Sequence, residues 1–100
     1  MALMEISVVP IGTCSTSISK YVAASEKALK KDSSVKRQIT AMSTIVEAGS
    51  VAKLFAVAKK MHEKALAAGA KRVITNIVLD DRRDKKASSE TKVASVMNKI

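Results

Sequence analysis

The order in which strand-like and helix-like hydrophobic patterns follow one another constrains the fold of this 100-residue chain more than any other feature. Apolar residues recurring every second position indicate a half-buried strand, and apolar residues three and four apart indicate an amphipathic helix. The strand-like segments are Leu3–Val9, Val35–Met42, Ser43–Glu47 and about Lys71–Leu79; the helix-like segments are 18–29, 51–66 and a last one with Val93, Val96, Met97 and Ile100 on one face. This order predicts an α+β fold: a single ferredoxin-like βαββαβ split sandwich over residues 1–100, with a four-stranded antiparallel sheet and an extra C-terminal helix.

Turn and cap residues predict where these elements begin and end. Pro10 and Gly12 should end the first strand, and Gly69 should stop the second long helix. Hydroxyl side chains are expected to cap the three helices: one of Ser15, Thr16 or Ser17 for the first, Ser50 for the second, and Ser88 or Ser89 for the last. The expected buried stripe of the second helix consists of Val51, Leu54, Phe55, Ala58, Met61, Ala65 and Leu66.

The core must be built from aliphatic side chains, because 47% of the residues are hydrophobic but only Tyr21 and Phe55 are aromatic. Aromatic side chains bury the largest areas, so a small domain with few of them has a thin stability margin. Both long helices of the predicted fold cover one face of the sheet, which leaves apolar residues such as Ile45, Ile74 and Val78 on the other. We therefore expect a homo-oligomer that buries this face.

The formal net charge is +9, from 18 Lys and Arg against 9 Asp and Glu, which makes anionic partners possible. The positive residues are scattered over the expected solvent faces of helices, which favours an ordinary solvated surface. A basic nucleic-acid-binding module with the topology of an RNA-recognition motif is the alternative, yet such modules stack bases on aromatic residues of the sheet. Tyr21 and Phe55 fall on expected helices. An acylphosphatase-type enzyme, which shares the topology, would need an arginine after the first strand, where this chain has hydroxyls.

Six consecutive charges, Asp80-Asp81-Arg82-Arg83-Asp84-Lys85, follow the fourth strand directly. Acids and bases alternate in pairs, so the segment can form charge-assisted carboxylate–guanidinium bonds within itself. This pattern predicts an ordered strand exit instead of a solvated tail. Arg82 and Arg83 are also expected to contact a neighbouring subunit or an anion.

Several residue types argue against catalysis, metals and membranes. Cys14 cannot form an internal disulfide, which fits a reducing interior, and no His–Asp pair accompanies it; it is expected to be a small packed residue. His62 has no second ligand at metal spacing. No signal peptide is evident, and no apolar stretch approaches the length of a membrane span. A soluble cytoplasmic protein without cofactor, metal or enzymatic activity is expected.

Nearly the whole chain resembles a family of small proteins. The matching stretches are Val8–Thr13 with Ser15, Ser17 and Ser19–Val22, Thr40–Glu47, Met61-His62, and Gly69–Val73 through the charged segment 80–85. They resemble the thiamine-binding-like family of ferredoxin-fold proteins, an uncharacterised protein family akin to the YkoF thiamine/hydroxymethylpyrimidine-binding proteins. The resemblance implies sheet-to-sheet homodimers that pair into homotetramers, and non-enzymatic binding of thiamine or its pyrimidine moiety at a subunit interface. Glu47 stands where the family has an acidic residue, whereas Cys14 occupies a variable position.

Three groups of polar residues are the predicted ligand contacts. A carboxylate such as Glu47 can pair with the ring nitrogen and exocyclic amine of an aminopyrimidine; a position on a solvent-facing turn is the competing interpretation of Glu47. Thr13, Ser15 and Ser17 place hydroxyls at a helix N-terminus, where helix capping is the competing interpretation. Thr44, Thr75 and Asn76 lie within apolar strands and need partners, which a ligand, a subunit or a neighbouring strand could supply.

Overall fold

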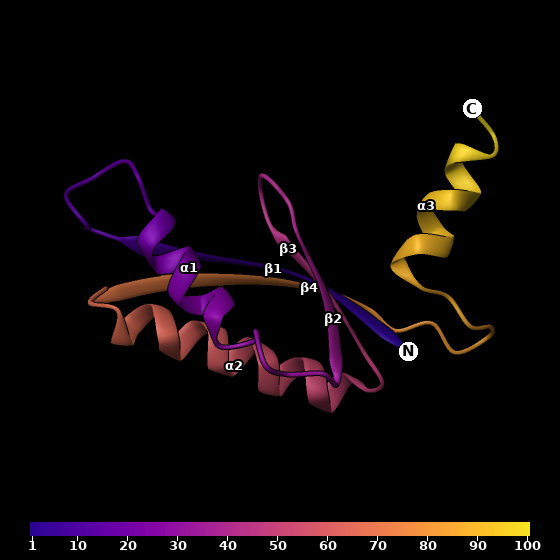
Figure 1. Cartoon of the computed structure of the whole chain (residues 1–100), viewed down its shortest axis with the longest axis horizontal. Coiled ribbons are helices and arrows are strands. Elements are labelled where there is room, and N and C mark those ends of the chain that lie inside the picture. The colour runs from indigo at the N-terminus through magenta and orange to yellow at the C-terminus, as the bar shows by residue number, and fades with distance from the viewer.

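The computed structural model describes residues 1–100 and shows one antiparallel four-stranded sheet with three helices (Figure 1). The elements are β1 (Ala2–Ile11), α1 (Ser19–Lys27), β2 (Val35–Ile39), β3 (Thr44–Ala48), α2 (Val51–Ala67), β4 (Arg72–Asp80) and α3 (Ser89–Met97). The strand order is β2-β3-β1-β4, which places the first strand at the centre of the sheet. This is the split βαββαβ arrangement with an added helix, so the predicted fold class is confirmed.

The pairing register decides which side chains share a face of the sheet. Met4 lies opposite Val46 of β3 and opposite Leu79 of β4, so these residues point toward α1 and α2. Their neighbours point the other way, to a face that no long helix covers. This uncovered face consists of Leu3, Glu5, Ser7 and Val9 of β1, Lys36 and Gln38 of β2, Ile45 and Glu47 of β3, and Ile74, Asn76 and Val78 of β4.

The hydrophobic core lies between the covered face and the two long helices. Met4 and Ile6 of β1 and Leu54 of α2 are at most 1% exposed. Val57, Ala58, Met61 and Ala65 continue the buried stripe of α2. The prediction that Phe55 and Leu66 belong to this stripe is wrong: Phe55 is 54% exposed and Leu66 is 39% exposed. Successive residues of a helix lie about 100° apart, so when Leu54 and Val57 face the core, Phe55 points toward solvent.

The predicted helix ends are correct for α2 and α3 but not for α1. The Ser50 side chain accepts from the N–H of Lys53, and Ser88 forms a capping box with Thr91. Gly69 follows α2 with φ of +116°, a left-handed conformation that favours glycine. Helix α1 instead begins after Ile18, which provides no side-chain cap. The Ser15 hydroxyl accepts from the N–H of Ser17 within the loop, so it is not free to reach the helix.

Two strand boundaries differ from the prediction. Strand β1 continues through Pro10, since its pairing with β3 stops at Ile6 and residues beyond this point pair on the β4 side only. Proline has no N–H to donate, and it is tolerated there because this part of β1 has a neighbouring strand on one side only. Strand β2 ends at Ile39 instead of Met42, and the Thr40 hydroxyl closes the turn to β3 by donating to the carbonyl oxygen of Ser43.

Helix α3 lies apart from α1 and α2, near the end of the sheet where the chain begins (Figure 1). None of its residues is buried. Polar contacts attach it: the N–H of Ser89 donates to Glu47, and Lys36 pairs with Glu90. None of the three helices combines the length and apolar character needed to cross a membrane.

Candidate functional site

A cavity of about 400 Å³ opens between α1, the middle of β1 and the turn from β2 to β3. It arises because β3 begins at Thr44, opposite Ile6, so the outer half of β1 lacks a neighbour on that side. Ile6 and Val8 of the covered face form part of its wall, together with Val22 of α1 and Met61 of α2. Its volume lies within the range of small-molecule sites.

The Glu26 side chain of α1 places a carboxylate in the lining of this cavity, and the residue is only 7% exposed. One carboxylate oxygen accepts from the Thr44 hydroxyl at 2.5 Å. The other accepts from Nη1 of Arg37 at 2.5 Å, and the same nitrogen donates to the backbone carbonyl of Glu26 at 2.6 Å. A buried carboxylate is stable only with such partners. Each oxygen can accept a further hydrogen bond, so the group can also bind a donor in the cavity.

The mouth of the cavity combines hydroxyls with exposed apolar side chains. Ser17 and Ser43 contribute hydroxyls, and the Ser43 hydroxyl donates to Glu5 on the uncovered face. Met42 is 89% exposed at the tip of the turn. Ser7 also lines the cavity although it belongs to the uncovered face, so the opening reaches the edge of that face.

Sequence reasoning missed Glu26 and Arg37. Glu26 lies four residues after Val22 and three before Leu29, so it falls within the apolar stripe of the first helix. A charged residue in such a stripe needs a buried partner, and this was the available signal. The partner could not be identified, because Arg37 comes from a strand that only tertiary folding brings next to α1.

Two of the predicted ligand residues, Ser17 and Thr44, line the cavity. Thr13 and Ser15 lie in the loop before α1 and outside the cavity, where the Thr13 hydroxyl donates to the carbonyl oxygen of Ser15. Cys14 in the same loop is exposed and has φ of 61°. The expectation that Cys14 is packed is therefore wrong, since the loop turns away from the core at this residue.

Glu47 lies on the opposite face of the sheet from Glu26 and is 5% exposed. Its carboxylate accepts from the N–H of Ser89 at 2.7 Å, at the first turn of α3. Glu47 thus anchors α3, which is favourable because a helix N-terminus carries partial positive charge. A second cavity, of about 410 Å³, lies beside this contact on the uncovered face and includes Ile45, Val78 and Val93.

The remaining strand residues have separate environments. Thr75 lies on the covered face, where its hydroxyl is 2.6 Å from Nδ1 of His62 on α2. The polar side chain therefore has a partner within the same subunit. Asn76 lies on the uncovered face and is exposed. Neither residue lines the cavity that contains Glu26.

The charged strand exit is ordered by its own ion pairs, as predicted. Nε and Nη2 of Arg82 donate to the two carboxylate oxygens of Asp84 at 2.6 and 2.9 Å, and Arg83 donates to Asp81. The hydrogen bonds from Arg82 lower the pKa of Asp84 to about 2, and those from Arg83 lower the pKa of Asp81. Both arginines are thus engaged within the chain.

Comparisons of sequence place the chain among proteins of one family. The sequence model of the thiamine-binding protein family matches residues 4–97. A UPF0045 protein from Methanothermobacter thermautotrophicus is 46% identical over 100 residues, covering all of both chains. The UPF0045 protein YqgV from Bacillus subtilis is 43% identical over 99 residues, covering 96% of this chain and 94% of the relative.

Solved structures share the fold. The protein MJ1052 from Methanocaldococcus jannaschii superimposes with a TM-score of 0.86 at 29% identity, covering 96% of this chain and 95% of its own. A Thermotoga maritima protein described as a candidate for thiamine biosynthesis or salvage gives a TM-score of 0.76 over 95% of this chain and 97% of its own. Its identity is 18%, so this second comparison supports the fold alone.

Proposed function

The chain belongs to the thiamine-binding protein family, and from that premise we propose that it binds thiamine or its hydroxymethylpyrimidine moiety without catalysing a reaction. The proposed site is the cavity between α1, β1 and the β2–β3 turn. The observation that carries this proposal is the buried carboxylate of Glu26 within a lining of aliphatic side chains and hydroxyls.

The chemistry of the ligand matches this lining. An aminopyrimidine presents an exocyclic amine beside a ring nitrogen, and a carboxylate accepts from both when the ring nitrogen is protonated. The thiazolium ring of thiamine is a cation, which a nearby carboxylate also favours. Aliphatic walls such as Ile6 and Val22 can cover the faces of the rings.

We further propose that a second copy of the chain covers the uncovered face and thereby borders the cavity. Val78 and Ile74 of this face are 63% and 43% exposed, and Val93 and Met97 of α3 are exposed to a similar degree. Exposed apolar residues that gather on one side mark an interaction surface. Since Ser7 joins the mouth of the cavity to the same face, the ligand would lie at the border between subunits.

The alternative of RNA binding lacks the residues it needs. Its stacking platform would occupy the uncovered face of β1 and β3, where Leu3, Glu5 and Ile45 stand instead of aromatic residues. Tyr21 and Phe55 lie on α1 and α2.

The decisive experiment compares two single acid-to-amide substitutions. Glu26→Gln should abolish most of the thermal stabilisation that thiamine or hydroxymethylpyrimidine gives the wild type, because the amide loses the negative charge and presents a donor. Glu47→Gln is the matched control, since this carboxylate is equally buried but faces α3. A ligand at 100 times its Kd stabilises by about 2.7 kcal/mol, which is readily measured.

The outcomes separate the possibilities. Loss of stabilisation in Glu26→Gln alone supports the cavity at α1. Loss in Glu47→Gln alone would move the site to the uncovered face next to α3 and contradict this assignment. Wild-type protein that shows no shift with either compound at millimolar concentration contradicts the ligand itself.

A further inference from the structure

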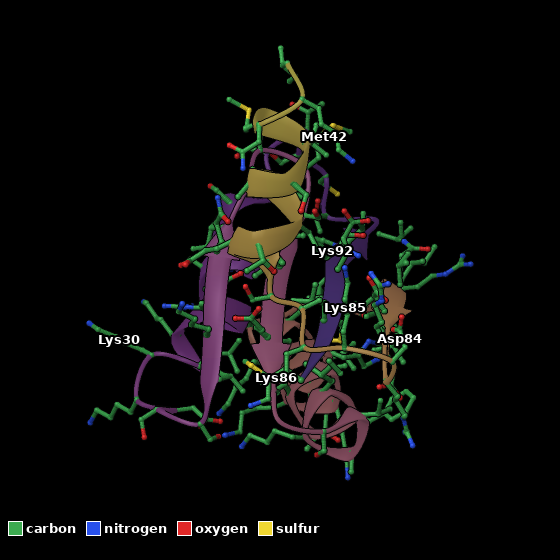
Figure 2. All side chains as sticks on the ribbon, turned by 90° about the vertical axis from the view of Figure 1, so that its right-hand side faces the viewer. Lys30, Met42, Asp84, Lys85, Lys86 and Lys92 are labelled. Atoms are coloured by element: carbon green, nitrogen blue, oxygen red, sulfur yellow. The ribbon has the colours of Figure 1, made fainter.

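The charged strand exit forms one side of another cavity, at the end of the sheet where α2 begins. The segment after Asp80 crosses the ends of β1 and β3 before it reaches α3, and Figure 2 shows Lys86 beside the end of β3. With Gly49, Ser50 and Val51 it encloses about 470 Å³. This cavity, here called the basic cavity, shares no lining residue with the one that contains Glu26.

Ion pairing leaves the two lysines of the basic cavity without a carboxylate partner. Every carboxylate of the segment is already engaged: Asp80 pairs with Lys92 of α3, and Asp81 and Asp84 pair with the two arginines. Lys85 and Lys86 line the cavity and form no ion pair. These two lysines therefore add unpaired positive charge to the cavity.

The opposite wall of the basic cavity is also suited to an anion. The N-terminal N–H groups of a helix lack intrahelical acceptors and carry partial positive charge. In α2 the Ser50 hydroxyl satisfies only the N–H of Lys53. Gly49 adds open backbone, since no atom lies within 4 Å of the position a Cβ would occupy. The two lysines and the first residues of α2 thus line the same volume.

We propose that the basic cavity binds the phosphate or diphosphate group of a small phosphorylated molecule. A phosphate offers several strong acceptor oxygens around one centre, so it can accept from both lysines and from the helix N-terminus together. A single carboxylate would satisfy fewer of these donors. The site is independent of the proposed thiamine site, and either can be present without the other.

Calorimetric titration of the full chain with inorganic pyrophosphate tests the proposal. The double variant Lys85→Ala/Lys86→Ala should weaken binding about tenfold or more, since it removes two charge-assisted hydrogen-bond donors. The control is Lys59→Ala/Lys60→Ala on the exposed side of α2. Both double variants lower the formal net charge by two from +9, so they differ only in where the charge is lost.

Amide chemical shifts supply the second readout. Pyrophosphate should shift the backbone amide signals of Gly49, Ser50 and Val51 in the wild type and not in the Lys85/Lys86 variant. The proposal is overturned if the wild type binds no pyrophosphate at millimolar concentration. It is also overturned if both double variants weaken binding equally, which would show general charge attraction, or if the shifted amides lie elsewhere.

Discussion

Glu26 has two roles at the residue scale, one in the stability of the fold and one in the proposed binding. Its carboxylate joins α1 to β2 through Arg37 and to β3 through Thr44. Removing one partner of a buried ion pair usually destabilises a protein by more than the intact pair stabilises it. The remaining partner is then buried without water and without a hydrogen bond. The same contacts fix the carboxylate in position for a ligand.

Thr44→Val tests the structural role of this cluster. Valine has nearly the shape of threonine but cannot donate to the carboxylate, so one oxygen of a buried charged group loses its partner. The free energy of unfolding should fall by about 1–3 kcal/mol, measured by urea denaturation. Thr16→Val in the exposed loop is the control and should change it by less than about 0.5 kcal/mol. Equal effects of the two substitutions would mean that the hydroxyl of Thr44 is not needed.

The three helices differ in how firmly the rest of the molecule holds them. Helix α2 has five buried residues and packs on the central strand. Helix α3 has none and is attached through Glu47, Lys36 and Asp80. A nine-residue helix is marginal in water by itself, so α3 depends on its cap and these polar contacts.

The two serine caps provide a matched pair of substitutions. Ser50→Ala should lower the global free energy of unfolding by about 1 kcal/mol, because α2 forms only together with the core. Ser88→Ala removes an equivalent bond but should mainly speed hydrogen exchange of the α3 amides, since α3 can unfold locally. Urea denaturation and hydrogen exchange at low protein concentration measure the two effects. Similar global losses in both variants would show that α3 is part of the cooperative core.

At the scale of the whole molecule, the two long helices cover one face of the twisted sheet and leave the uncovered face free. The uncovered face carries apolar residues from β4 together with charged residues, and α3 extends beside it (Figure 1). A two-fold pairing of this face would bury the same residues twice. Three parts of the molecule thus have different proposed functions. The uncovered face associates with a second copy, the cavity near the β2–β3 turn binds the ligand, and the cavity where α2 begins binds phosphate.

Val78→Lys tests the proposed association. The substitution places an unpaired charge on the uncovered face, on the edge strand β4, in both subunits, so the dimer dissociation constant should rise at least about tenfold. Phe55→Lys, on the exposed side of α2, replaces a similarly exposed apolar residue and should leave association unchanged. Analytical ultracentrifugation over a concentration series measures both. A wild type that stays monomeric throughout would contradict the association.

The sequence determined the order of the elements, the caps of α2 and α3 and the self-pairing of the charged exit, because these depend on residues close together in the chain. Periodicity also placed most core residues on the correct face. The tertiary structure alone decided which buried carboxylate meets the cavity: the sequence favoured Glu47, whereas the fold brings Arg37 and Thr44 to Glu26. It alone decided that Phe55 is exposed and that Lys85 and Lys86 remain without an ion-pair partner. Such partnerships join residues distant in sequence, and only the register of strands and the packing of helices bring them within hydrogen-bonding distance.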